Sequence, residues 1–169
     1  SNLGNILKEL GKLKDAEISY RRAVQLNPNF INAHLNLGNI LRELGKLKDA
    51  ENSFRKAIEI NPDFTEAHSN LGNILRDLGN LKDAEISARK AIQIKPDFTE
   101  AHSNLGIILI ELGKLKDAEI SFRKAIEINP DFPEAHLNLG KILRDLGKFK
   151  DAEISFRKSV QLNPSDGKA

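Results

Sequence analysis

The stretch His68-Ser-Asn-Leu-Gly-Asn-Ile-Leu-Arg-Asp-Leu-Gly79 decides the fold, because close copies of it return along the chain at a constant interval. The glycine of its Asn-Leu-Gly segment marks the interval of 34 residues, with equivalents at Gly4, Gly38, Gly72, Gly106 and Gly140. A period of this length indicates stacked structural repeats rather than one irregular core.

The repeat predicts a single array over residues 1–169. Its units are 1–30 (incomplete), 31–64, 65–98, 99–132 and 133–166, followed by a tail at 167–169. No polar capping helix follows Pro164, although repeat arrays usually need modified end units. We therefore expect a piece of a longer array, in which the last helix, with Phe156, Val160 and Leu162, favours end-to-end association.

Each repeat is expected to contain two helices. In the third repeat, the apolar residues of the first stripe fall at helical spacing: Ala67, Leu71, Ile74, Leu75 and Leu78. The second stripe consists of Leu81, Ala84, Ala88, Ala91 and Ile92. Gly79 separates the stripes and Pro96 ends the second one, since these two residue types commonly interrupt helices. The predicted class is all-α, with about ten helices.

The composition of the chain limits the classes of function that can be expected. The chain is 40% hydrophobic and 30% charged, with a net charge of +2, which gives no reason to expect nucleic-acid or membrane binding. It has no cysteine, no apolar run long enough to cross a bilayer and no signal-peptide pattern. These observations favour the cytoplasm and exclude a disulfide framework or a cysteine nucleophile.

With these recurring residues the chain resembles the tetratricopeptide repeat (TPR) family. In the third repeat the matching pattern is Asn70-Leu71-Gly72, Leu75, Gly79, Ala84, Ala91 and Pro96, and it recurs over essentially the whole chain. The resemblance implies antiparallel helix pairs wound into a right-handed superhelical solenoid. It also implies that the first helix of each repeat lines a concave groove and the second helix lies on the convex side.

One departure from the family pattern concerns the core. The second helix carries an aromatic residue at Tyr20, Phe54, Phe122 and Phe156, but the third repeat has Ala88. Deletion of a buried phenylalanine side chain lowers the stability of a protein by about 3–5 kcal/mol. Either a neighbouring group fills the space or this repeat is less stable than the others. Replacement of Ala88 with phenylalanine should stabilise the chain if there is a hole and destabilise it otherwise.

Rows of asparagine are the first candidate binding feature. The main row is Asn36, Asn70, Asn104 and Asn138, and a second row includes Asn39 and Asn73. An amide side chain can donate to and accept from a peptide main chain, and the row resembles the asparagine ladder in the TPR region of O-GlcNAc transferase. Helices about 10 Å apart would meet every third residue of an extended peptide, which rises about 3.3 Å per residue. Alternatively, the asparagines bond only to neighbouring helices.

Other side chains on the first helices suggest what such a ligand contains. Ile107 and Ile110 replace the asparagine and arginine of other repeats, and with Leu137 they form a candidate apolar anchor. Arg42 and Arg76 favour acidic ligand side chains. The alternative for the isoleucines is drift between repeats, because single exposed apolar residues are common.

The remaining polar rows give no catalytic or metal site. The histidines His34, His68, His102 and His136 occur once per repeat, on helices too far apart to share a metal ion. The basic pair on each second helix follows a glutamate by four residues, which predicts a surface of ion pairs. No nucleophile with an orienting base and no phosphate-binding glycine loop occurs. We therefore expect no enzyme and no cofactor.

The sequence thus favours a scaffold that binds a protein or an extended peptide segment in the groove of first helices. The alternative is a self-stacking spacer from a longer repeat protein that carries another module.

Overall fold

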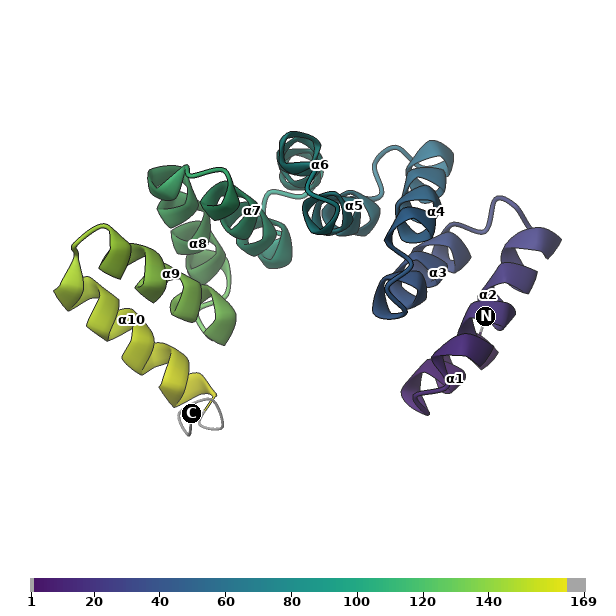
Figure 1. Ribbon diagram of the computed structural model, residues 1–169, viewed down its shortest axis with the longest axis horizontal. Coiled ribbons are helices and arrows are strands. Elements are labelled where there is room, and N and C mark those ends of the chain that lie inside the picture. Colours follow the sequence, from purple (N-terminus) through teal and green to yellow (C-terminus); the bar gives the residue numbers. More distant parts are fainter. Residues whose placement is uncertain (1, 164–169) are drawn as a thin grey trace. The chain divides into compact units, whose positions relative to one another are not determined.

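The computed structural model describes residues 2–163, which form ten α-helices and no strand (Figure 1). The first helices of the pairs are α1 (Asn2–Glu9), α3 (Ile31–Glu43), α5 (Thr65–Asp77), α7 (Thr99–Glu111) and α9 (Pro133–Asp145). The second helices are α2 (Leu13–Leu26), α4 (Leu47–Ile60), α6 (Leu81–Ile94), α8 (Leu115–Ile128) and α10 (Phe149–Leu162). The predicted all-α class is confirmed. The expectations for Pro164 and the tail at 167–169 lie outside the described residues.

The helices form two compact units, Ser1–Ile94 with α1 to α6 and Lys95–Ala169 with α7 to α10. In the first unit α3 packs against α2, α4 and α5. In the second unit α9 packs against α7, α8 and α10, and the hairpin of α9 and α10 can be followed in Figure 1. Each unit therefore brings neighbouring first helices into direct contact.

A glycine ends the first helix of every pair. Gly45, with a φ of 72°, donates its N–H to the carbonyl of Arg42, and Lys46 donates to the carbonyl of Leu41. These two bonds are the Schellman motif, in which glycine adopts the left-handed conformation without the penalty of a side chain. The same two bonds recur at the other turns, after Gly11, Gly79, Gly113 and Gly147.

A histidine closes the turn between consecutive pairs. The Nε2 atom of His34 donates to the carbonyl oxygen of Pro28 at 2.8 Å. The same contact, at the same distance, is made by His68 to Pro62, His102 to Pro96 and His136 to Pro130. The histidine row therefore holds the turns.

Packing inside a pair depends on the glycine in the middle of the first helix. In four pairs an aromatic ring of the second helix lies on this glycine; a Cβ atom added to Gly106 would come within 2.6 Å of the Phe122 ring. In the third pair a Cβ atom on Gly72 would meet the carbonyl oxygen of Ala84 at 3.2 Å. Ala88 is fully buried. The backbone of α6 thus takes the place of the missing ring, and the structure supports the alternative without a hole.

The outer surface of the second helices carries the expected ion pairs. In each of them an arginine lies within 3.0 Å of the glutamate four residues earlier: Glu17–Arg21, Glu51–Arg55, Glu85–Arg89, Glu119–Arg123 and Glu153–Arg157. The prediction that these basic side chains belong to a surface of ion pairs is confirmed.

Glu119 and Glu17 also join neighbouring pairs. Lys148 lies 2.8 Å from the buried Glu119, and Lys46 lies 2.7 Å from Glu17. The hydrogen bond from Lys148 lowers the pKa of Glu119, with Arg123 adding to the effect against the opposing influence of burial. Asn80 occupies the lysine position after Glu51, so the contact between the second and third pairs has no such bridge.

Replacement of Lys148 with asparagine is expected to lower the free energy of unfolding by up to about 1 kcal/mol at pH 7. The folded pKa of Glu119 is depressed. The ion pair therefore contributes fully above the unfolded glutamate pKa of about 4.3, and its contribution is lost as the pH falls through the folded value. Urea denaturation at pH 7 and pH 3 checks this, with the exposed Lys150→Asn as control. Equal losses at both pH values would contradict it.

Candidate peptide-binding surface

The predicted site residues of the first unit lie on α3 and α5, and several of them bond to other side chains of these two helices. The amide of Asn70 donates to Oδ1 of Asn39 at 3.1 Å. The guanidinium of Arg42 lies 3.7 Å from Asp77, which Arg76 also contacts at 2.7 Å. In this unit the first-helix face, meaning the surface that carries these residues, is therefore cross-linked by its own polar groups.

Asn36 takes part in a contact that the sequence analysis missed. The hydroxyl of Tyr20 donates to Oδ1 of Asn5, which joins α2 to α1. Burial raises the pKa of Tyr20, and a hydrogen bond from the Asn36 side chain partly opposes this shift. The available signal was that Tyr20 is the chain's single tyrosine, at a position where other repeats have phenylalanine or alanine.

Asn73 is a buried side chain whose amide oxygen lacks a hydrogen-bond donor within residues 2–163. It is 8% exposed, and its Oδ1 atom has no hydrogen-bond partner among residues 2–163. A buried acceptor without a donor costs about 1–3 kcal/mol. A donor that reached this atom would recover part of that cost.

The corresponding surface of the second unit carries apolar side chains. Ile107 and Ile110 on α7 and Leu137 on α9 are half-buried. Ile107 stands two repeats after Asn39, and Ile110 two repeats after Arg42. Because isoleucine has no polar side-chain atom, neither cross-helix bond of the first unit has a counterpart here.

Asn138 is the second-unit equivalent of Asn70. It is half-buried on α9, and Ile107 offers it no acceptor. The amide of Asn138 therefore has no counterpart of the Asn39 acceptor on α7. Asn104, on α7, is also half-buried.

The structure thus divides the predicted residues between the units. The first unit holds Asn36, Asn39, Arg42, Asn70, Asn73 and Arg76, and the second holds Asn104, Ile107, Ile110, Leu137 and Asn138. In the described part of the chain, no helix has the length and apolar character to cross a membrane. Over the same residues, no three histidine, aspartate or glutamate side chains gather as a metal site would require.

Solved structures share this fold at low sequence identity. A crystal structure of MamA has a TM-score of 0.84 and 22% identity, covering 100% of this chain and 99% of its own. PilF of Pseudomonas aeruginosa has a TM-score of 0.88 and 21% identity, with 96% and 74% coverage. YrrB, titled a TPR protein with an unusual peptide-binding site, has a TM-score of 0.72 and 24% identity, with 96% and 84% coverage. The predicted helical repeat solenoid is confirmed.

Family profiles match most of the sequence. The profile described as TPR repeat matches residues 4–41, 38–79 and 106–147, and the one described as tetratricopeptide repeat matches 65–98 and 133–166. Among curated proteins, no sequence matches this chain. The likeness of the asparagine row to that of O-GlcNAc transferase stays a prediction. Because the profiles cover well over half of the residues, the chain belongs to the tetratricopeptide repeat family.

Proposed function

We propose that this chain is a protein-interaction scaffold, and that α7 and α9 provide its principal contact for an extended peptide. The observation that carries the proposal is the pair Ile107 and Ile110. They stand at positions where the first unit forms cross-helix polar bonds. With isoleucine at these positions, the second unit has a half-buried apolar surface where the first unit has polar groups bonded to each other. Such an apolar surface suits an anchoring side chain of a ligand.

Asn138 and Asn104 supply the main-chain contacts in this proposal. An amide matches the alternating N–H and C=O groups of an extended peptide. Asn138 has lost the equivalent of the Asn39 acceptor, so a ligand carbonyl can take its N–H without breaking a bond to α7. Leu137 lies next to Asn138 in sequence and extends the apolar contact. The ligand would place one large apolar side chain against Ile107, Ile110 and Leu137.

The first unit would contribute differently. A ligand would have to break the Asn70–Asn39 bond in order to bond to either side chain. The net gain in binding free energy at this point is therefore small. Rotation of Asn73 would let its Oδ1 accept a ligand N–H, satisfying an atom that has no partner among residues 2–163. Arg42 and Arg76 favour carboxylates in the ligand, although Asp77 competes for both.

Restoring the polar pattern is the test. The variant Ile107→Asn/Ile110→Arg gives the second unit the residues of the first, and it is expected to lose most of the peptides that the parent protein enriches from a random library. Asn138→Ala should weaken the same peptides, because it removes their main-chain contact. Loss of one buried anchor typically costs 1 kcal/mol or more, about fivefold in affinity.

The control is Asn36→Ala, since Asn36 bonds to Tyr20 in the first unit. It should leave the enriched set unchanged. Equal enrichment by the parent protein and by Ile107→Asn/Ile110→Arg would refute the anchor.

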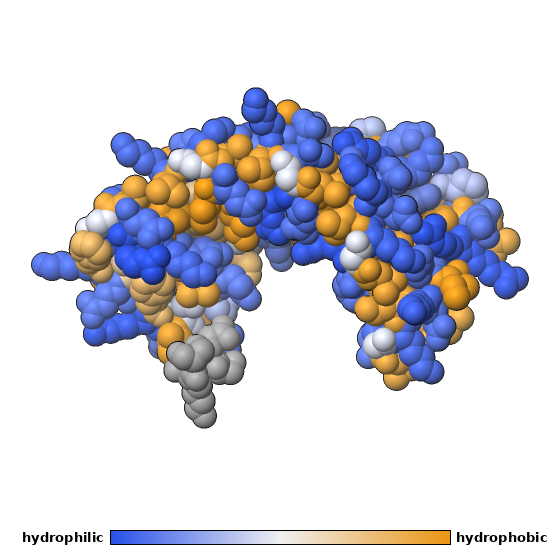
Figure 2. Space-filling model, in the orientation of Figure 1, coloured by the Kyte–Doolittle hydropathy of each residue, from blue (hydrophilic) through white to orange (hydrophobic). Residues whose placement is uncertain are grey.

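A specific observation favours the second candidate, a self-stacking spacer. Leu3 and Ile6 on α1 are 59% and 53% exposed, whereas their equivalents Leu37 and Ile40 are 4% and 0% exposed. Figure 2 shows apolar residues gathered over α1. Phe156 on α10 is half-buried while Phe122 is fully buried. End-to-end contact between copies would cover both surfaces, and a library without enriched peptides together with a concentration-dependent mass would support it.

A further inference from the structure

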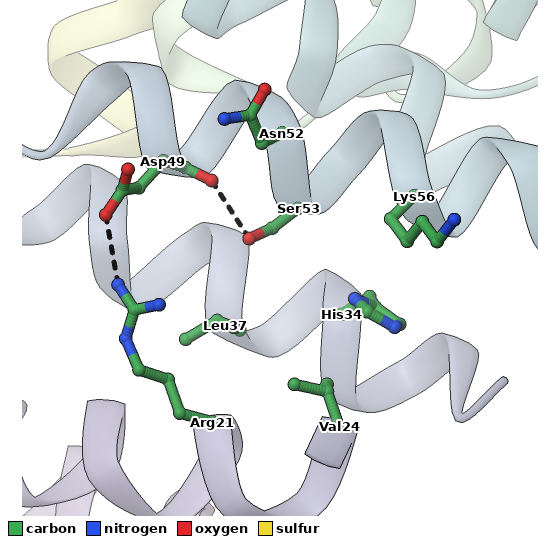
Figure 3. A pocket seen from close by; sticks show the side chains of 8 residues that line it. All are labelled: Arg21, Val24, His34, Leu37, Asp49, Asn52, Ser53 and Lys56. Carbon is green, nitrogen blue, oxygen red and sulfur yellow. Dashed lines mark hydrogen bonds and ion pairs between the residues drawn. The ribbon is translucent and has the colours of Figure 1, made fainter. Parts of the chain in front are cut away.

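Within each unit, consecutive pairs are joined in one way: the second helix of a pair packs on the first helix of the next pair. The contacts of this kind are α2 with α3, α4 with α5 and α8 with α9. Figure 3 shows the first of them, where Val24 on α2 and Leu37 on α3 line the same cavity. The apolar side of a first helix is therefore covered by the second helix that precedes it.

Charged side chains also cross these boundaries, in a fixed order. Glu17 lies 2.9 Å from Arg21 of its own helix and 2.7 Å from Lys46 of the next pair. Glu119 makes the same two contacts, with Arg123 and Lys148. A glutamate at this position thus binds two cations, one from its own helix and one from the following pair.

The first boundary has a second ion pair of the same polarity. Arg21 reaches Asp49 on α4 at 3.0 Å, the contact drawn as a dashed line in Figure 3. Both ion pairs join the second helix of one pair to residues of the next pair. They therefore fix which pair precedes and which follows.

On α10 the same side is present without its second partner. Glu153 lies 2.7 Å from Arg157 of its own helix, but 58% of its side chain is exposed, against 11% for Glu119. Among residues 2–163 no second cation reaches Glu153. Phe149 is 70% exposed, whereas Leu115 at the equivalent position of α8 is half-buried. The surface of α10 that a following pair would cover is thus open.

The other half of this contact is present at α1. Leu3 and Ile6 are more than half exposed. Lys12 occupies the position of Lys46, and Asp15 occupies that of Asp49. Both Lys12 and Asp15 are exposed, and neither has a partner of opposite charge among residues 2–163. The groups missing around α10 are therefore those that α1 and the turn after it present.

We propose that α1 of one copy of this chain packs on α10 of a second copy, in the register that joins consecutive pairs within a unit. Lys12 then supplies the second cation to Glu153 of the second copy, and Asp15 pairs with Arg157 of the second copy. The inference rests on the self-stacking candidate above and specifies its contact. Because the two surfaces differ, each added copy leaves one of them open, and association continues beyond a dimer.

Charge reversal tests the contact, with the average mass measured by analytical ultracentrifugation at increasing concentration of the 169-residue protein. The mass of the parent protein is expected to rise with concentration. Lys12→Glu and Glu153→Lys each place like charges opposite each other, so each is expected to associate at least about tenfold more weakly. Lys82→Glu makes an equal change of charge at an exposed position of α6 and should associate as the parent protein does.

A mixture of the two reversed variants distinguishes a lost contact from a damaged fold. In an equimolar mixture the altered surface of each variant faces the opposite charge on the other variant. The unaltered surfaces match each other as in the parent protein. The mixture is therefore expected to recover most of the association that each variant loses alone, whereas two misfolded variants would recover none.

The possible failures are distinguishable. A parent protein with one mass at every concentration would overturn both this contact and the self-stacking candidate. Association that neither reversal weakens, or that the mixture does not recover, would overturn this contact alone. Both outcomes are independent of the proposed peptide face, because Ile107→Asn/Ile110→Arg alters neither α1 nor α10 and should associate as the parent protein does.

Discussion

Replacement of Ala88 with phenylalanine is expected to lower the free energy of unfolding by about 1–3 kcal/mol, although phenylalanine is the commonest residue at this position of the repeat. The reason lies in the spacing of α5 and α6. Gly72 meets the backbone of Ala84 and Ala88 directly, so no space remains for a ring. Accommodating phenylalanine requires the two helices to separate, which breaks the packing around Leu75 and Ala84, both buried.

Urea denaturation followed by circular dichroism measures this effect. Ala88→Ser is a suitable control, since it adds one small atom at the same buried position without requiring a ring-sized space. A phenylalanine variant at least as stable as the parent protein would show that α5 and α6 separate without cost and that the close contact is not a preferred arrangement.

The reverse substitution, Phe122→Ala, is expected to cost about 3–5 kcal/mol. Phe122 is fully buried, and its ring lies against Gly106. Its removal leaves a cavity unless α7 and α8 approach as α5 and α6 do.

The same denaturation experiment checks this result, with Ile120→Ala as a control at an exposed position of the same helix. A loss below about 1 kcal/mol for Phe122→Ala would indicate that α7 and α8 close over the gap. In that case the spacing of a pair would be set by the aromatic residue alone.

Much of the fold follows from periodicity. Gly72 and Gly79 recur at one interval and mark the middle and the end of each first helix, while Pro96 and its equivalents mark the turns between pairs. These signals are local, so they can be recognised without knowing which helices touch. The ion pair of Glu119 with Arg123 is equally local, because residues four apart on a helix face each other.

The candidate site was less accessible to sequence reasoning. The position of Ile107 and Ile110 on a first helix follows from helical spacing, but the bond between Asn70 and Asn39 depends on how two helices approach across a repeat boundary. The same holds for Tyr20 with Asn5 and for Lys148 with Glu119. Spacing along the chain leaves such distances undetermined, so it could not decide whether an asparagine serves a ligand or a neighbouring helix.

The bond from His34 to the Pro28 carbonyl also bears on how the chain folds. Its two partners are six residues apart, so it closes a very small loop and requires no distant segment to be in place. The histidine bond and the Schellman turns both join residues that are close in sequence. Chains dominated by such local contacts have a low contact order and fold quickly. Each turn can therefore form before the helices on either side have found their neighbours, and assembly of the array can begin at any repeat.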